Sequence, residues 1–148
     1  MSARRLLFIL ALIVFVVTLV LLVTGSKWLV ISLSDTQNIP SGTFITWLGL
    51  IALPASIILG INGLYFPKNK RDRLFKKIML FAVILAILWV PISYLLAGNL
   101  SFSFTEKAVF QGGQDAMHWF WRYTYGIPIF SLGTFLLYGI LSAFRKKE

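Results

Sequence analysis

The stretch LLFILALIVFVVTLVLLV, residues 6–23, runs for eighteen residues without a charged side chain. A helix needs about 20 predominantly apolar residues to cross the hydrocarbon core of a bilayer. The basic start, MSARR, also resembles a secretory signal, whose apolar core spans about 7–15 residues and ends at a small-residue cleavage site. This run is longer, and its exit, VTGSKW, is a weak cleavage site. The stretch is therefore predicted to be a retained transmembrane helix over about residues 6–24.

Three further apolar segments follow, at about residues 43–66, 78–97 and 123–144. None of the four shows the two-residue alternation of a membrane barrel strand. Hydrophobic residues make up 58% of the chain and charged residues only 13%, whereas a soluble domain carries about 25% charged residues. The sequence therefore predicts an all-α membrane protein with a single domain, residues 1–148, folded as a four-helix transmembrane bundle.

The basic residues define an orientation for this bundle. Short loops rich in Lys and Arg stay in the cytoplasm. Eleven of the 14 basic residues lie before the first predicted helix, between the second and third, or after the fourth: Arg4, Arg5, Lys68, Lys70, Arg71, Arg73, Lys76, Lys77, Arg145, Lys146 and Lys147. We therefore expect both termini and a basic loop, residues 67–77, to be cytoplasmic. Residues 25–42 and 98–122 become outer loops, and the plasma membrane is the expected location.

The net charge of +9 has the same origin. Basic residues at a cytoplasmic surface attract anionic lipid headgroups, with about 1 kcal/mol for each, so membrane lipids are expected partners. A nucleic-acid site would interleave aromatic residues with basic ones for base stacking. The basic loop offers only Phe75, and no nucleic-acid partner is expected.

Small residues recur along the predicted helices, where they allow close helix approach in lipid. A stripe with four-residue spacing occupies the second helix, and smaller sets occupy the third and fourth: Ala52, Ser56 and Gly60, then Ala82 and Ala86, then Gly139. These residues are predicted to form the seams of one bundle, with a homo-oligomer face as the alternative.

Two prolines are expected to kink helices. Pro54 and Pro91 each remove a backbone donor and displace the carbonyl four residues earlier, at Leu50 and Ile87. No Asp, Glu, Lys, Arg or His lies at membrane depth in the four predicted spans. Since such a residue is the usual mark of an ion-coupled or proton-coupled site, proton-exchange transport is not expected.

The outer loops contain short alternating patterns, at residues 31–34 and 100–105. Two-residue alternation indicates strands with one apolar face. One interpretation is a small extracellular two-segment β element over the bundle. The other is a continuation of the first helix and a coil lying on the headgroups.

The stretch HWFWRYTYG, residues 118–126, holds the only histidine of the chain. It is predicted to be helical until Gly126 and Pro128 interrupt it. At 100° per residue, Asp115, His118 and Arg122 share one face of that helix. Gln111 joins this face if the helix starts one turn earlier, and Trp119 borders it.

Three interpretations of this polar face stay open. Trp and Tyr concentrate at membrane interfaces, so the face is first a solvated side of an interfacial aromatic girdle. It could instead recognise a ligand or partner, with Arg122 holding a phosphate or carboxylate. In a catalytic interpretation, Asp115 would orient His118 for acid–base chemistry. A zinc site needs three or four ligands, and cysteine is absent, so neither a metal nor another cofactor is expected.

We expect a non-catalytic accessory, assembly or scaffold protein that contacts a protein partner through its outer loops and helix faces. The alternative is a lipid-binding or amphipathic-ligand-binding protein, or an enzyme, with a polar site at the outer interface. A small pore or holin-like channel ranks third, because polar residues are too sparse to line a continuous path.

Overall fold

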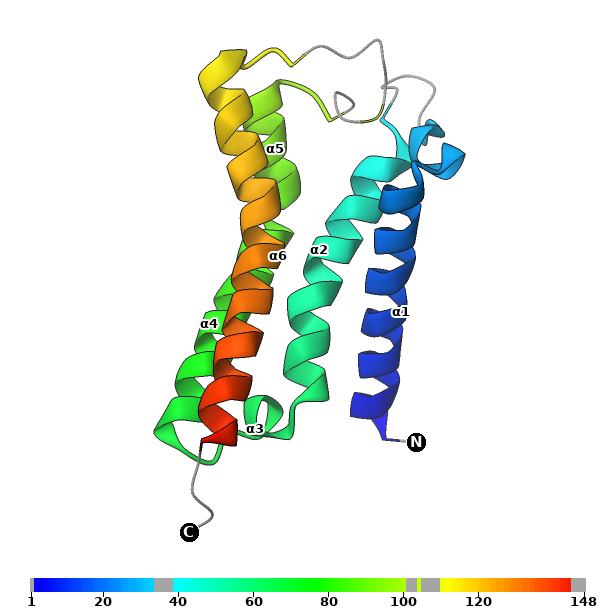
Figure 1. Ribbon diagram of the computed structural model, residues 1–148. Coiled ribbons are helices and arrows are strands. Elements are labelled where there is room, and N and C mark those ends of the chain that lie inside the picture. Colours follow the sequence, from blue (N-terminus) through cyan, green and yellow to red (C-terminus); the bar gives the residue numbers. More distant parts are fainter. Residues whose placement is uncertain (1, 34–38, 101–103, 105–109, 145–148) are drawn as a thin grey trace.

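The computed structural model describes residues 2–33, 39–100, 104 and 110–144, and within these ranges it is all-helical without a strand. Figure 1 shows the elements in chain order: α1 (Ala3–Thr24), the 3-10 helix η1 (Lys27–Val30), α2 (Ser41–Gly60), α3 (Asn62–Tyr65), α4 (Lys70–Ile87), α5 (Trp89–Ala97) and α6 (Gly113–Ala143).

Three of these helices, α1, α2 and α6, are each long and apolar enough to cross a membrane. A fourth span results if α4 and α5, which meet at a 47° bend, count as one broken crossing. The expectation of an all-helical fold is thus confirmed for the described residues, with three or four helices that could span a membrane. The N-terminus, α3, the start of α4 and the end of α6 all lie at one end (Figure 1). This end is termed the basic end because it carries the arginines and lysines of residues 4–5 and 68–77; the other is the distal end.

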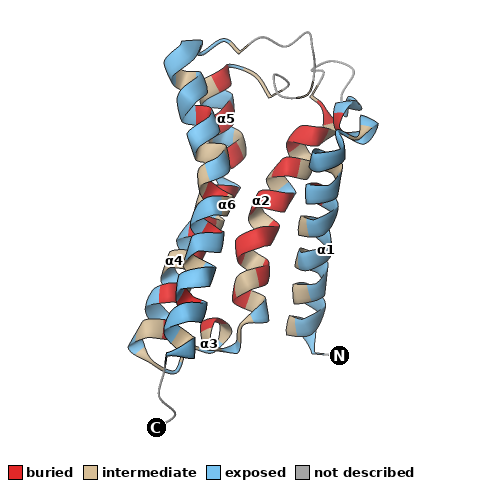
Figure 2. Cartoon of the chain, in the orientation of Figure 1, coloured by how far each residue is buried: buried red, intermediate tan, exposed pale blue. Residues whose placement is uncertain are grey.

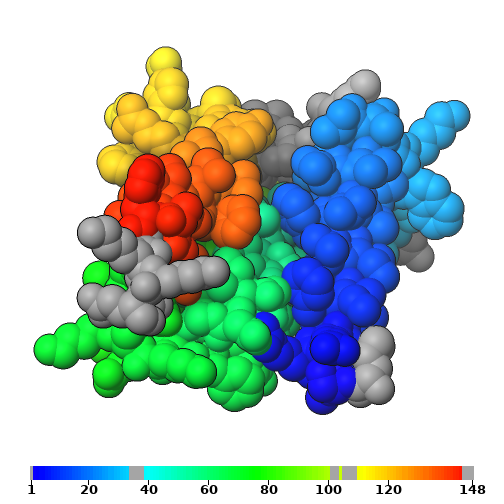
Figure 3. All heavy atoms as spheres, turned by 60° about the horizontal axis from the view of Figure 1, so that its bottom comes forward, coloured from blue at the N-terminus to red at the C-terminus, as the bar shows by residue number. Residues whose placement is uncertain are grey.

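Helix α2 is the centre of the arrangement. It contacts α1 on one side and α4, α5 and α6 on the other, whereas the backbone of α1 lies close to α2 and η1 alone among the described elements. Figure 2 shows the consequence: buried residues gather on α2, and α1 is exposed along almost its whole length. Thr18, at the α1–α2 contact, is the single buried residue of α1. In the space-filling view from the basic end, α2 lies between α1 and α6 (Figure 3).

The second predicted helix ends earlier than expected. We predicted residues 43–66, but α2 stops at Gly60, Ile61 adopts an extended conformation, and α3 adds a single turn. The last carbonyls of a helix have no intrahelical donor. Arg4 of α1 donates hydrogen bonds to two of them, at Leu59 and Gly60. These two carbonyls therefore have hydrogen-bond partners where the helix ends.

The basic loop expected over residues 67–77 is wrong beyond Asn69. Helix α4 begins at Lys70, and the Asn69 side chain caps it by accepting a hydrogen bond from the Asp72 N–H at 2.7 Å. Hydropathy marks where lipid contact begins, whereas Lys and Arg are themselves good helix formers. The helix therefore continues two turns past the apolar segment toward the basic end.

Helix α6 is also longer than expected. The predicted interruption at Gly126 and Pro128 is absent, and one helix runs from Gly113 through Ala143, ten residues ahead of the predicted start. Pro128 removes only one donor, and neighbouring helices make such residues tolerable in membrane helices. The buried residues Phe120, Ile127, Ser131 and Tyr138, spaced seven, four and seven apart, form one continuous packing face through the proline.

Pro54 and Pro91 have different effects on the helices that contain them. Helix α2 continues through Pro54 without a break, whereas the α4–α5 bend lies directly before Pro91, at Leu88. The predicted displacement of the Ile87 carbonyl therefore coincides with a real break.

The first outer segment folds back on itself. Leu33 N–H donates to the Ile39 carbonyl at 2.9 Å and Ser41 N–H to the Ile31 carbonyl at 2.8 Å, around an isolated bridge between Ser32 and Pro40. This part of the predicted β element thus pairs within its own segment. Most of the other segment, residues 100–105, lies outside the described residues.

Candidate functional site

The predicted polar face lies on the first turns of α6, near the distal end. Asp115, His118 and Arg122 are all exposed. Trp119 is 61% exposed, and the Arg122 guanidinium carbon lies 5.4 Å from the centre of its ring. Within the described part of the chain, no hydrogen bond or ion pair joins Asp115, His118 and Arg122 to one another. The structure thus brings Arg122 and Trp119 together and presents the other two side chains outward.

Gln111 lies just before α6 and connects it to α5. Its backbone N–H donates to the Ala97 carbonyl at 2.9 Å, and its side chain lies against Gly98. Gly98 has a φ of +75°, which a residue with a Cβ rarely adopts, and a Cβ there would come within 2.6 Å of Gln111 Oε1. Gln111 therefore helps to join α5 to α6.

Because α6 is continuous, the side of the helix that carries the polar face continues beyond Arg122 toward the basic end. At 100° per residue, Gly126 lies about 20° from Asp115 around the helix axis and Gly133 lies at the same angle as Asp115. A Cβ built at Gly126 or Gly133 would meet nothing within 4 Å. Large apolar side chains continue this face, with Ile129 at 69% and Leu136 at 61% exposure. We term the set Asp115, His118, Arg122, Gly126, Ile129, Gly133 and Leu136 the outward face of α6.

The opposite side of α6 makes all of its core contacts. Phe120 and Ile127 are 1% exposed and pack with Leu50, Ala86 and Trp89. Toward the basic end, Tyr138 packs with Ile58, Leu64, Phe75 and Met79. Phe120 and Tyr138 lie about 140° from Asp115 around the helix. The outward face therefore points away from the core of this chain.

The small residues predicted to form helix seams divide into two groups. Ala52, Ser56, Ala82 and Ala86 are buried, and a Cβ at Gly60 would approach Phe8 of α1 to 2.8 Å. These five lie at contacts within the bundle. Gly139 differs, since a Cβ there would meet nothing within 4 Å.

Polar groups inside the bundle form internal hydrogen bonds. Trp47 Nε1 donates to the carbonyls of Ala86 and Ile87, both at 3.1 Å, and the Tyr123 hydroxyl donates to the Leu85 carbonyl. Trp89 Nε1 donates to Thr124 Oγ1 at 2.8 Å. Aromatic donors thus join four helices, α2, α4, α5 and α6, around the α4–α5 break. This network was not predicted from the sequence, although the carbonyl displaced by Pro91 at Ile87 indicated where donors would be needed.

A buried carboxylate near the basic end was also missed. Asp72 is 5% exposed, and the Tyr138 hydroxyl donates to its Oδ1 at 3.1 Å. Gly63 of α3 lies against both side chains. Since Asp72 follows the helix cap Asn69 by three residues, a capping pattern could have placed it on a helix rather than in a loop.

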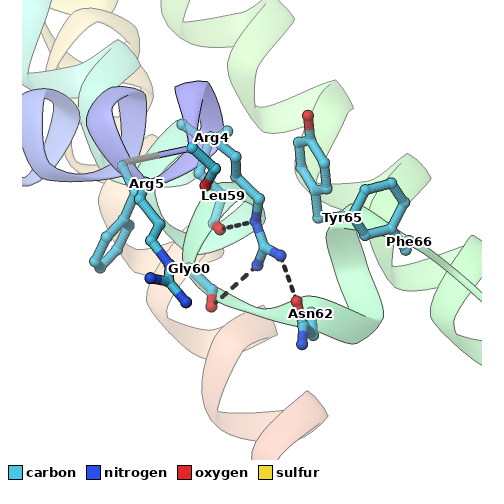
Figure 4. Close-up of a pocket in the computed structure, with 9 residues that line it drawn as sticks. Arg4, Arg5, Leu59, Gly60, Asn62, Tyr65 and Phe66 are labelled. Atoms are coloured by element: carbon cyan, nitrogen blue, oxygen red, sulfur yellow. Dashed lines mark hydrogen bonds between the residues drawn. The ribbon is translucent and has the colours of Figure 1, made fainter.

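A pocket of about 540 Å³ opens at the basic end, between the start of α1 and the α2–α3 turn. Figure 4 shows Arg4 reaching across it: Nε donates to the Leu59 carbonyl at 2.8 Å, one terminal nitrogen to the Gly60 carbonyl at 3.4 Å and the other to Asn62 Oδ1. The guanidinium carbon also lies 4.7 Å from the centre of the Tyr65 ring. Arg4 therefore connects the first turn of α1 to the end of α2.

Compared with protein-family models, curated proteins and solved structures, the chain gives no match. A fold can support many functions, so the function of this chain has to be argued from the geometry of its own surfaces.

Proposed function

We propose that this protein is a non-catalytic accessory or assembly subunit that binds a transmembrane helix of a partner protein along the outward face of α6. In the proposed topology α4 and α5 form one broken crossing, which gives four crossings in the plasma membrane. The basic end then faces the cytoplasm, in agreement with the preference of Lys and Arg for that side.

The observation that carries the proposal is the position of Gly126 and Gly133. A glycine inside a helix costs about 0.5–1 kcal/mol relative to alanine. A Cβ added at either glycine would meet no described atom of the rest of the fold within 4 Å. The fold therefore gains nothing from their small size. In lipid, small residues let a second helix approach closely, and a partner helix would use the space that these two positions leave.

The polar end of the same face would give such a partner its specificity. Asp115, His118 and Arg122 are exposed directly beyond Gly126, where α6 emerges from the apolar part of the bundle. Charged groups at the rim of an interface steer association and reject wrong partners more than they add affinity. A partner with a complementary polar segment next to its transmembrane helix would fit this arrangement.

The pore alternative has less support. Polar side chains of the spans, including Trp47, Thr18, Ser56 and Ser131, bond to backbone carbonyls within the bundle. A conducting path would need such groups to face a common opening.

Site-specific photocrosslinking in native membranes tests the proposal. A benzophenone amino acid replaces Ile129 on the outward face, and in a matched control it replaces Ile13 of α1, which is 53% exposed. The proposal predicts a protein adduct of one defined mass from position 129, and lipid adducts alone from position 13. An adduct containing two copies of this chain would instead indicate a homodimer. Equal patterns from the two positions would contradict the proposed face.

A further inference from the structure

The pocket at the basic end combines two kinds of wall. Phe8 and Leu59 supply an apolar side, and Ser2, Arg5 and Asn62 supply hydrogen-bond donors. None of its nine lining residues is acidic. A concave site with a few convergent polar groups on an apolar wall is the usual form of a small-ligand site.

The two arginines in this pocket have different roles. The guanidinium of Arg4 is occupied by Leu59, Gly60 and Asn62. The guanidinium of Arg5 is exposed, and within the described ranges it has no hydrogen-bond or ion-pair partner. In Figure 4 it lies beside Gly60, below Arg4. Arg4 thus joins the walls of the pocket, while the guanidinium N–H groups of Arg5 can donate to a bound ligand.

The remaining donors fit an anion. The Oδ1 of Asn62 accepts from Arg4, which leaves its amide nitrogen as a donor, and the Ser2 hydroxyl makes no capping bond to α1. A guanidinium forms two parallel hydrogen bonds to a phosphate more readily than an ammonium group does. From this geometry we propose that the pocket binds the phosphate group of an anionic phospholipid, with Arg5 as its main contact.

A lipid suits the site better than free phosphate for two reasons. The pocket lies where α1 and α2, both candidate membrane spans, reach their ends. Lipid headgroups occupy this level of a bilayer. In addition, Phe8 adjoins the exposed apolar surface of α1, where Leu12 is 41% and Val16 46% exposed. The acyl chain of a lipid would pack along that surface.

Native mass spectrometry of the full chain in detergent tests the site. The probe is dioleoylphosphatidylglycerol, added to delipidated protein. The test variant is Arg5→Gln, and the matched control is Arg73→Gln, which removes the same charge from an exposed residue of the basic end outside this pocket. Melting temperatures of both variants check the fold. Arg5→Lys serves as a second variant, because it keeps the charge and loses the paired geometry.

The proposal predicts one tightly bound phosphatidylglycerol, with affinity reduced about tenfold or more by Arg5→Gln and less than twofold by Arg73→Gln. Arg5→Lys should give an intermediate loss. Equal losses in Arg5→Gln and Arg73→Gln would overturn the proposal, since they would reflect general charge attraction. Displacement of the lipid by an equal concentration of inorganic phosphate would also overturn it, because the site would then serve the free ion.

Discussion

The indole Nε1 of Trp47 in α2 lies 3.1 Å from the carbonyl oxygen of Ile87, the last residue of α4. The residue four positions later is Pro91, which has no N–H to donate. Trp47 therefore supplies the hydrogen bond that proline removes, and it supplies it from a different helix. A residue of α2 thus stabilises the α4–α5 bend, so the sequence of α2 contributes to the shape of the α4–α5 pair.

Trp47→Phe should destabilise the bundle by about 1 kcal/mol, the usual size of a side-chain hydrogen bond between membrane helices. The carbonyls of Ala86 and Ile87 would lose a donor in an apolar environment, where an unpaired polar group is costly. Circular dichroism melting in detergent measures the effect. Trp28→Phe is the matched control, because Trp28 is 68% exposed. An equal change in the two variants would contradict a bonding role for Trp47.

Two glycines should respond to alanine in opposite directions. At Gly49 a Cβ would collide with the side chain of Thr18 in α1, whereas at Gly139 it would meet nothing within 4 Å. Gly49→Ala should destabilise by about 1–3 kcal/mol through overpacking. Gly139→Ala should stabilise by about 0.5–1 kcal/mol, because alanine is the better helix former. Thermal unfolding of both variants against the wild type checks the signs, and a tolerated alanine at position 49 would argue against the α1–α2 contact.

The buried pair Asp72 and Tyr138 should be energetically coupled. A double-mutant cycle with Asp72→Asn and Tyr138→Phe should give a coupling energy of about 0.5–2 kcal/mol. The reason is that the hydroxyl of Tyr138 donates to a carboxylate that is 5% exposed. Unfolding in mixed micelles provides the four free energies. Tyr125→Phe, at a 58% exposed position, should show no coupling to Asp72→Asn, and coupling near zero for Tyr138 would contradict the pairing.

The length of the apolar runs predicted the helical architecture and its candidate membrane spans well, because crossing a bilayer sets a minimum length that local composition reveals. The ends of the helices were predicted less well. Helix α4 starts at Lys70 rather than near residue 78, since charged residues that leave the lipid can stay helical. Helix α6 passes through Gly126 and Pro128, since its packing face outweighs two local helix breakers.

The error in the predicted helix ends also explains what was missed at the candidate site. Asp115, His118 and Arg122 were placed on one helix face from their spacing alone. Their continuity with Gly126 and Gly133 was hidden by the predicted interruption at Gly126. The pocket at the basic end was hidden for another reason: Arg4 contacts Asn62, which is 58 residues away in the chain. No local pattern indicates such a contact, so the arginines were read only as signals of orientation.

The most direct test of the proposed function is copurification from native membranes with a leucine at one of two open glycines. Gly133→Leu fills the outward face of α6, and Gly139→Leu adds the same side chain to the same helix about 120° from Gly133 around the axis. The account predicts that a stoichiometric partner protein is lost with Gly133→Leu and retained with Gly139→Leu, while neither variant unfolds at a lower temperature than the wild type. Retention of the partner by both variants, or its loss from both, would contradict the assignment of this face.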